Sequence, residues 1–115
     1  MTTEADFTLT PGEERGVPVV TVGGEVDLAT APRLAEHLEG LGESGATTVV
    51  VDLTEVRFVD STALGVLVAA MKRLRAGGGD LRLVVTEPHL AKVFSITGLD
   101  DVFAIYPTTA DAVSA

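Results

Sequence analysis

The chain has 115 residues, of which 46% are hydrophobic and 4% aromatic, and it contains no Trp and no Cys. This composition suits one compact domain with a core of Val, Leu and Ala, and it excludes disulfides, thiolate metal sites and cysteine nucleophiles. The formal net charge of −9 argues against nucleic-acid binding, because contact with a phosphate backbone needs clustered Lys and Arg.

The N-terminal residues MTTEADF lack the basic region and the apolar stretch of a signal peptide. The longest uncharged run around the most apolar predicted helix is residues 61–71. This run is far shorter than the roughly 20 residues that a membrane-spanning helix needs. We therefore expect a cytoplasmic protein with no membrane segment.

The first half of the chain predicts a β-hairpin, a helix and a further strand. Pro18 indicates that the second hairpin strand lies at an edge of the sheet, because proline cannot donate to a strand ladder. Asp27 or Thr30 can cap the helix, and Pro32 fits its first turn. The further strand is apolar throughout, which is typical of burial on both faces of a sheet. The elements are predicted at residues 7–9, 17–22, 31–41 and 47–53, with a short extension at 58–59.

The second half of the chain alternates helices and strands. The glycines at 77–79 end the first helix, and basic residues in its last turns complement the helix dipole. The predicted elements are helix 62–76, strand 81–85, helix 88–96, strand 102–106 and helix 108–113. This alternation predicts an α/β fold with a largely parallel or mixed sheet, and no linker divides the chain into domains.

The junction Asp60-Ser61-Thr62 is polar within an otherwise apolar stretch. One interpretation is a helix cap, in which Asp60 or Ser61 accepts a hydrogen bond from the first turn; losing such a cap costs about 1 kcal/mol. Residues 63–71 are apolar on nearly every side, so the helix is either sheltered all round or presents an apolar face to a partner. Gly65 favours the close approach of another backbone or a helix–sheet contact.

Catalytic chemistry has little support in the sequence. Ser61 lacks the Gly-x-Ser-x-Gly context of a nucleophile elbow, and no motif ties His37 or His89 to it as a general base. Four carboxylates can converge at one end of the predicted sheet, as solvated turn residues or, alternatively, as a hard-cation site or the acids of a small enzyme. They are Glu25, Asp27, Asp52 and Asp60. We expect no enzyme activity, no catalytic residue, no cofactor and no metal.

Three segments stand out, and their order and spacing extend along nearly the whole chain: Gly24-Glu25-Val26-Asp27, Phe58-Val59-Asp60-Ser61-Thr62-Ala63-Leu64-Gly65 and Phe94-Ser95-Ile96-Thr97-Gly98-Leu99. As a set, they resemble the STAS family (sulphate transporter and anti-sigma factor antagonist domains), in particular its small single-domain bacterial anti-sigma factor antagonists. The resemblance implies that residues 1–115 form one STAS domain. Its fold would be a mixed four- to five-stranded sheet with helices packed mainly on one side.

The resemblance also implies partner switching in transcription regulation, as in a stress response. The unmodified protein, a monomer, would bind an anti-sigma factor that is a serine kinase of the histidine-kinase-like ATPase fold, and so free a sigma factor. Phosphorylation would release the antagonist, and a serine phosphatase would reset it. The phosphorylated residue follows the Asp in the family, so it maps onto Ser61, with Thr62 as the secondary candidate. Glu25, Asp27 and Asp60 would lie around it.

We expect the docking surface on the exposed part of helix 62–71, with the 24–30 loop beside it. Leu64, Val68 and Met71 are predicted to lie partly outward. Many members of the family have Gly where this chain has Ala63, whose methyl group can alter partner preference. An alternative function is a STAS scaffold that binds partners whether or not it is phosphorylated. A sulphate-transporter origin is disfavoured, because no membrane segment accompanies the domain.

Overall fold

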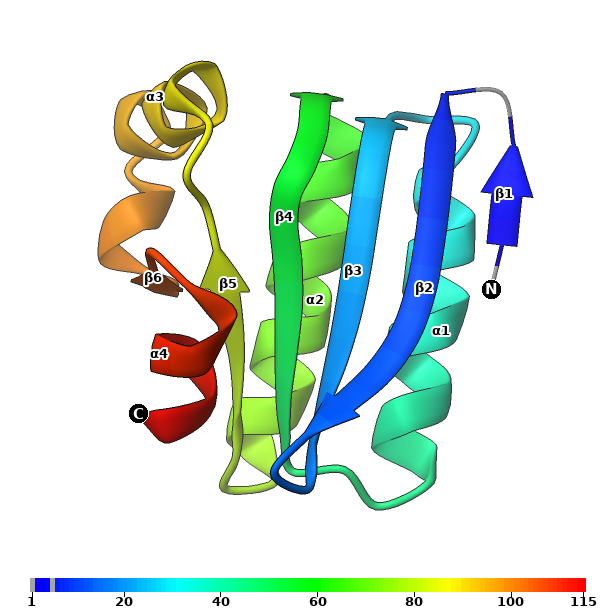
Figure 1. Cartoon of the computed structure of the whole chain (residues 1–115), viewed down its shortest axis with the longest axis vertical. Helices are drawn as coiled ribbons and strands as arrows, with labels where there is room; N and C mark the ends of the chain where they lie inside the picture. Colours follow the sequence, from blue (N-terminus) through cyan, green and yellow to red (C-terminus); the bar gives the residue numbers. More distant parts are fainter. Residues whose placement is uncertain (1, 5) are drawn as a thin grey trace.

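The computed structural model describes residues 2–4 and 6–115, which form one mixed β-sheet with helices on both faces (Figure 1). The strands lie in the order β1-β2-β3-β4-β5-β6, antiparallel from β1 to β3 and parallel from β3 to β6. The strands are β1 (Thr2–Glu4), β2 (Phe7–Glu14), β3 (Val17–Val26), β4 (Thr48–Val59), β5 (Asp80–Val84) and β6 (Ala104–Tyr106). The helices are α1 (Ala31–Glu43), α2 (Ser61–Ala76), α3 (Pro88–Ile96), the 3-10 helix Leu99–Asp101 and α4 (Thr109–Ser114).

Two hydrophobic clusters lie on opposite faces of the sheet. Helices α1, α2 and α3 pack on one face and enclose the larger cluster, whereas α4 alone covers part of the other face (Figure 1). In β4, Val49 and Val51 belong to the larger cluster and Val50 to the smaller one, because successive side chains point to opposite faces. All three are at most 1% exposed, so the prediction of a strand buried on both faces is confirmed.

The predicted α/β class, with a mixed sheet and helices mainly on one side, is also confirmed. The three-residue strand β1, which the sequence did not predict, adds to the five predicted strands. The prediction that Pro18 marks an edge strand is wrong, because β3 lies between β2 and β4. Pro18 precedes Val19, the first residue of β3 that pairs with β4, so its missing N–H removes no bond from that ladder.

The last predicted strand, residues 102–106, is shorter than expected. A 3-10 helix ends at Asp101, and β6 begins only at Ala104. Between them, Phe103 is 4% exposed and packs edge-to-face against Phe94, with ring centroids 5.8 Å apart. The chain therefore uses this segment to close the larger cluster rather than to lengthen the sheet.

The C-terminal ends of β3 and β4 meet at one edge of the sheet, as parallel strands require (Figure 1). The turn after β3 and the start of α2 are therefore neighbours, and the Asp60 N–H donates to the Val26 carbonyl at 3.2 Å. Gly24, near the end of β3, has a φ of +82°, and a Cβ there would overlap the Asp6 carbonyl oxygen. The close approach of Asp6 to Gly24 therefore requires glycine. No helix within the described ranges is long and apolar enough to cross a membrane.

Candidate functional site

Helix α2 begins at Ser61, and its N-cap is Asp60. Asp60 has an extended backbone (φ −109°), and its Oδ1 accepts the Ala63 N–H at 3.0 Å. Of the two predicted capping residues, the structure thus uses Asp60. Ser61 is exposed, and its hydroxyl makes no hydrogen bond within the described part of the chain. The fold therefore leaves this hydroxyl accessible and does not use it as a cap.

The second carboxylate oxygen of Asp60 reaches a different element. Asp60 Oδ2 accepts the backbone N–H of Leu28 at 2.9 Å, across 32 positions of sequence. Leu28 lies in the turn of residues 27–30 between β3 and α1. One carboxylate thus binds both the first turn of α2 and the 27–30 turn, with one oxygen for each.

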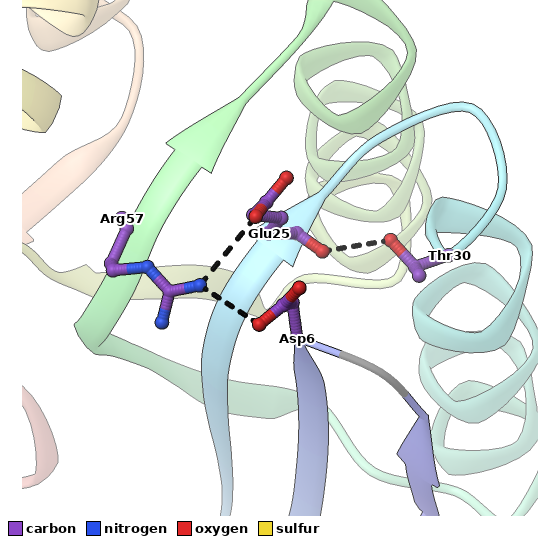
Figure 2. A network of polar contacts seen from close by, with 4 residues as sticks. All are labelled: Asp6, Glu25, Thr30 and Arg57. Atoms are coloured by element: carbon purple, nitrogen blue, oxygen red, sulfur yellow. Dashed lines mark hydrogen bonds and ion pairs between the residues drawn. The ribbon is translucent and has the colours of Figure 1, made fainter.

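The 27–30 turn is also held by its own side chains. Asp27 Oδ1 accepts the N–H groups of Ala29 (3.0 Å) and Thr30 (3.1 Å). The Thr30 hydroxyl donates to the Glu25 carbonyl at 2.9 Å (Figure 2) and accepts the Asp27 N–H at 3.0 Å. Thr30 is the N-cap residue of α1, but its side chain makes no capping bond to that helix. The predicted capping pair therefore shapes the turn.

Glu25 was expected beside Ser61, but its carboxylate is engaged elsewhere. Glu25 Oε2 lies 3.5 Å from Arg57 Nη2, and Asp6 Oδ1 lies 3.4 Å from the same nitrogen (Figure 2). Val26, the next residue, points into the larger cluster, so Glu25 points to the sheet face opposite α1 and α2. These side chains are largely exposed, and such ion pairs contribute about 0 to 1 kcal/mol.

The four carboxylates singled out in the sequence do not form one cluster. Asp52 binds the Thr54 N–H at 3.0 Å and the Thr109 hydroxyl at 3.2 Å, away from the residues around Asp60. Within residues 2–4 and 6–115, no group of three His, Cys, Asp or Glu side chains is arranged to hold a metal ion. Neither the hard-cation site nor the carboxylate enzyme gains support from this geometry.

The phase of α2 corrects part of the predicted docking surface. Met71 is 4% exposed and Leu67 is 1% exposed, so the prediction that Met71 lies partly outward is wrong. Leu64 and Val68 are half-buried and pack against the larger cluster. Gly65 is exposed, and a Cβ there would meet no atom within 4 Å, so no backbone of this chain approaches it closely.

A groove of about 270 Å³ lies between α1 and α2 and extends along α2 from Thr62 to Arg73. Thr62, Gly65, Val66 and Ala69 line its α2 side, and Leu38 lines its α1 side. At its far end, Arg73 Nη2 lies 4.0 Å from Glu39 Oε1. Helix α2 is therefore not buried on all sides, and its exposed surface is not wholly apolar. The side of α2 that faces the groove carries small side chains as far as Arg73.

Two exposed apolar residues at this end of the molecule were missed in the sequence. Leu28 is 73% exposed and Phe58 is 50% exposed. Phe58 stands opposite Glu25 in the ladder between β4 and β3, one residue before the strand ends. Their exposure cannot be predicted from residue type, because the turn and the strand register determine that these side chains lie outside the core.

The histidines do not complete a nucleophilic site. Burial lowers the pKa of His37, which lies on α1 and lines a pocket with Leu9 of β2. His89 is exposed near the start of α3. No hydrogen bond between described residues joins either imidazole to Ser61, so this chain shows no general base for that hydroxyl.

The chain is similar to proteins of one family throughout most of its length. The anti-sigma-B factor antagonist of Listeria monocytogenes is 42% identical over 86 residues, which cover 75% of each chain. The crystal structure of an anti-sigma factor antagonist from Mycobacterium paratuberculosis is 32% identical, with a TM-score of 0.87 over 99% of this chain and 97% of that one.

The structure of the Bacillus cell fate determinant SpoIIAA in its phosphorylated form, at 24% identity and a TM-score of 0.70 over 94% of this chain and 96% of that one, shares the fold. The Listeria and Mycobacterium proteins are both named as antagonists, which is the name of a regulatory role and not of an enzyme. The family model described as the STAS domain matches residues 11–112. The chain belongs to the STAS domain family.

Proposed function

We propose that this chain is an anti-sigma factor antagonist that acts by partner switching. The unphosphorylated form binds an anti-sigma factor that is also a serine kinase, and so frees a sigma factor. Phosphorylation at Ser61 releases the kinase, and a serine phosphatase restores the binding form. The names of the similar proteins support the antagonist role, and the geometry around Ser61 supports the switch.

One observation carries the proposal: the exposed Ser61 hydroxyl has no role in holding the fold. Asp60 already caps α2, so Ser61 Oγ is available to a kinase. In the transfer, a new bond joins Ser61 Oγ to the γ-phosphorus of ATP, the bond from that phosphorus to the bridging oxygen of ADP breaks, and a base of the kinase takes the hydroxyl proton. Thr62 is a poorer acceptor, because it is half-buried and lines the groove between α1 and α2.

Phosphate at Ser61 has opposite effects on the fold and on a complex. The group adds about −1.5 to −2 charges at the N-terminus of α2, where the helix dipole favours negative charge by about 0.3 to 1 kcal/mol. The fold therefore accepts the phosphate. In an interface, the same group has to lose water beside the Asp60 carboxylate, so binding weakens.

The proposed docking surface follows from the observed phase of α2. It comprises Ser61, the groove that Thr62 lines on one flank of α2, the half-buried Leu64 and Val68 on the other flank, and the 27–30 turn. Met71 drops out because it is buried. Glu25 contributes indirectly, because its carbonyl oxygen holds Thr30 while its carboxylate faces the other side of the sheet.

The experiment is affinity capture from the lysate of the source organism, with the purified chain as bait. Wild type and Ser61→Ala are expected to retain one kinase-fold anti-sigma factor, and Ser61→Asp to lose it. Ser95→Asp is the matched control, because it adds the same charge at an exposed serine on α3 and is expected to retain the partner. Equal retention of the partner by all four baits would instead indicate a scaffold that does not depend on phosphorylation.

A further inference from the structure

Leu28 is an apolar side chain that the fold holds in solvent. It is 73% exposed, although the turn that carries it is well ordered by hydrogen bonds. The side chains of Asp27 and Thr30 fix the backbone on both sides of Leu28. A leucine presented by a fixed turn loses little conformational freedom on binding, which favours its use as a contact for a partner.

The position of Leu28 depends on Asp60. The bonds made by Asp27 and Thr30 lie within the turn and its own strand, whereas the Leu28 N–H reaches across to Asp60 Oδ2 at 2.9 Å. The other oxygen of the same carboxylate caps α2 through the Ala63 N–H. A displacement of the Asp60 carboxylate therefore affects the 27–30 turn and the start of α2 together.

A phosphate on Ser61 would cause such a displacement. It lies on the residue next to Asp60, so the two anions repel each other. It also competes for the N–H groups of the first turn of α2, which are the natural anion ligands at a helix N-terminus. One of these groups is the Ala63 N–H that Asp60 now holds. Displacement of Asp60 from this position removes the acceptor of the Leu28 N–H.

We propose that Leu28 is an apolar contact for the partner, and that Asp60 couples its position to the phosphorylation state of Ser61. This inference rests on the proposed function, because it states how the switch at Ser61 reaches the binding surface. Asp60 is then a positioning residue, and phosphorylation weakens binding both by its own charge and by breaking the bond that holds Leu28 to Asp60.

The surroundings of Leu28 define the chemistry of the partner. Leu28 directly follows Asp27, on a chain whose net charge is −9. A partner that fits has an apolar recess for one branched side chain, bordered by Lys or Arg. In the free protein, the Asp27 carboxylate that would meet this border already accepts two backbone N–H groups, so its orientation is set before binding.

The first test needs no partner. Amide hydrogen exchange is measured by NMR on wild type, on Asp60→Asn and on the chain with phosphoserine incorporated at position 61. The Leu28 amide is expected to exchange at least tenfold faster in both altered proteins. The amides of Ala29 and Thr30, which Asp27 holds, are internal controls and are expected to change less than twofold. Unchanged exchange at Leu28 in the phosphorylated chain would overturn the coupling.

Asp60→Asn is chosen because it separates the two roles of Asp60. Asn retains one carbonyl oxygen and is as good an N-cap residue as Asp, so it can hold Ala63 but not Leu28 as well. Its urea midpoint is expected to stay near that of wild type. A midpoint that falls as far as that of Asp60→Ala would show that the substitution acts through the cap.

The second test uses the anti-sigma factor captured by wild type, purified. Leu28→Ala is expected to lower its affinity at least tenfold, and Asp60→Asn at least fivefold. In the Leu28→Ala background, Asp60→Asn is expected to have no further effect, which a purely structural role of Asp60 would not produce. Val102→Ala is the control, because this exposed residue lies near the other end of α2, where Arg75 binds its carbonyl.

The outcomes separate this inference from the proposed function. If phosphoserine at position 61 abolishes binding while Leu28→Ala binds like wild type, the switch stands and the role of Leu28 is rejected. If the two substitutions have additive effects, the coupling through Asp60 is rejected. If phosphorylation leaves the affinity unchanged, or wild type retains no anti-sigma factor at all, the proposed function itself fails.

Discussion

The two ends of α2 differ in how the fold uses their polar groups. At the C-terminal end, Arg75 binds Asp80 Oδ1 and the Val102 carbonyl, both at 2.8 Å. The Gly79 N–H donates to the Leu74 carbonyl oxygen at 2.8 Å. At the N-terminal end, Ser61 is unused by the fold, although Asp60 caps the helix. The C-terminal end of α2 is organised for stability, whereas the N-terminal end presents groups that folding does not need.

The contrast between groups that stabilise the fold and groups that folding does not need also applies to apolar side chains, and it gives the largest expected effect. Leu67→Ala, at a site 1% exposed, is expected to lower the free energy of unfolding by about 2 to 5 kcal/mol, because it leaves a cavity in the core. Leu28→Ala is expected to change it by less than about 0.5 kcal/mol, because Leu28 is exposed. Urea denaturation followed by circular dichroism measures both. A large loss of stability in Leu28→Ala would mean that the exposed turn is structural after all.

Glycines at the two ends of α2 are expected to respond in opposite ways. A Cβ on Gly79 would overlap the Thr47 carbonyl oxygen, so Gly79→Ala is expected to destabilise the protein by about 1 to 3 kcal/mol. Gly65 has open space around it, and Gly65→Ala is expected to stabilise α2 by up to about 1 kcal/mol. Thermal unfolding distinguishes the two variants, because the midpoint is expected to fall in Gly79→Ala and to rise in Gly65→Ala. Destabilisation by Gly65→Ala would contradict the open surface described for α2.

The cap at the N-terminal end has a smaller expected effect. Asp60→Ala is expected to lower the free energy of unfolding by about 1 kcal/mol, because the Ala63 N–H loses its acceptor. Ser61→Ala is the matched control, since Ser61 makes no such bond, and is expected to leave stability unchanged. A comparable loss in both variants, measured by urea titration, would mean that the serine shares the capping role.

The smallest effect is expected from His37, which belongs to neither end of α2. Because burial lowers its pKa in the folded state, the unfolded chain binds this proton more readily. Stability is therefore expected to be full above the unfolded pKa of about 6.5 and to decrease as the pH falls below it. Urea midpoints at pH 8.0 and 5.5 measure the decrease, and His37→Gln is expected to reduce it. An unchanged pH dependence in the variant would assign the decrease to other groups.

Local patterns predicted the strand-to-helix junction well. The polar residues before an apolar helix placed its start within one residue, and Asp60 was one of the two predicted caps. The uniform apolar pattern of β4 also predicted burial on both faces. These features depend on a few adjacent residues, so the sequence contains the information that they need.

Features that depend on register or helical phase were less predictable. Irregularities in the β3–β4 ladder before Glu25 decide which residues of the two strands stand opposite each other, and Glu25 turns toward Arg57. Met71 lies on the buried side of α2, which an almost wholly apolar helix does not reveal. The Asp60–Leu28 bond joins residues 32 positions apart, so only the folded chain brings them together.

In the proposed switch, phosphate on Ser61 weakens binding and leaves the chain folded. The most direct test of this switch is calorimetric titration of the captured anti-sigma factor with the unmodified chain and with the chain that has phosphoserine at position 61. We predict an affinity at least a hundredfold lower for the phosphorylated chain, with an unfolding midpoint that is equal or higher. Equal affinities for the two forms, or a phosphorylated chain that fails to fold, would contradict the account.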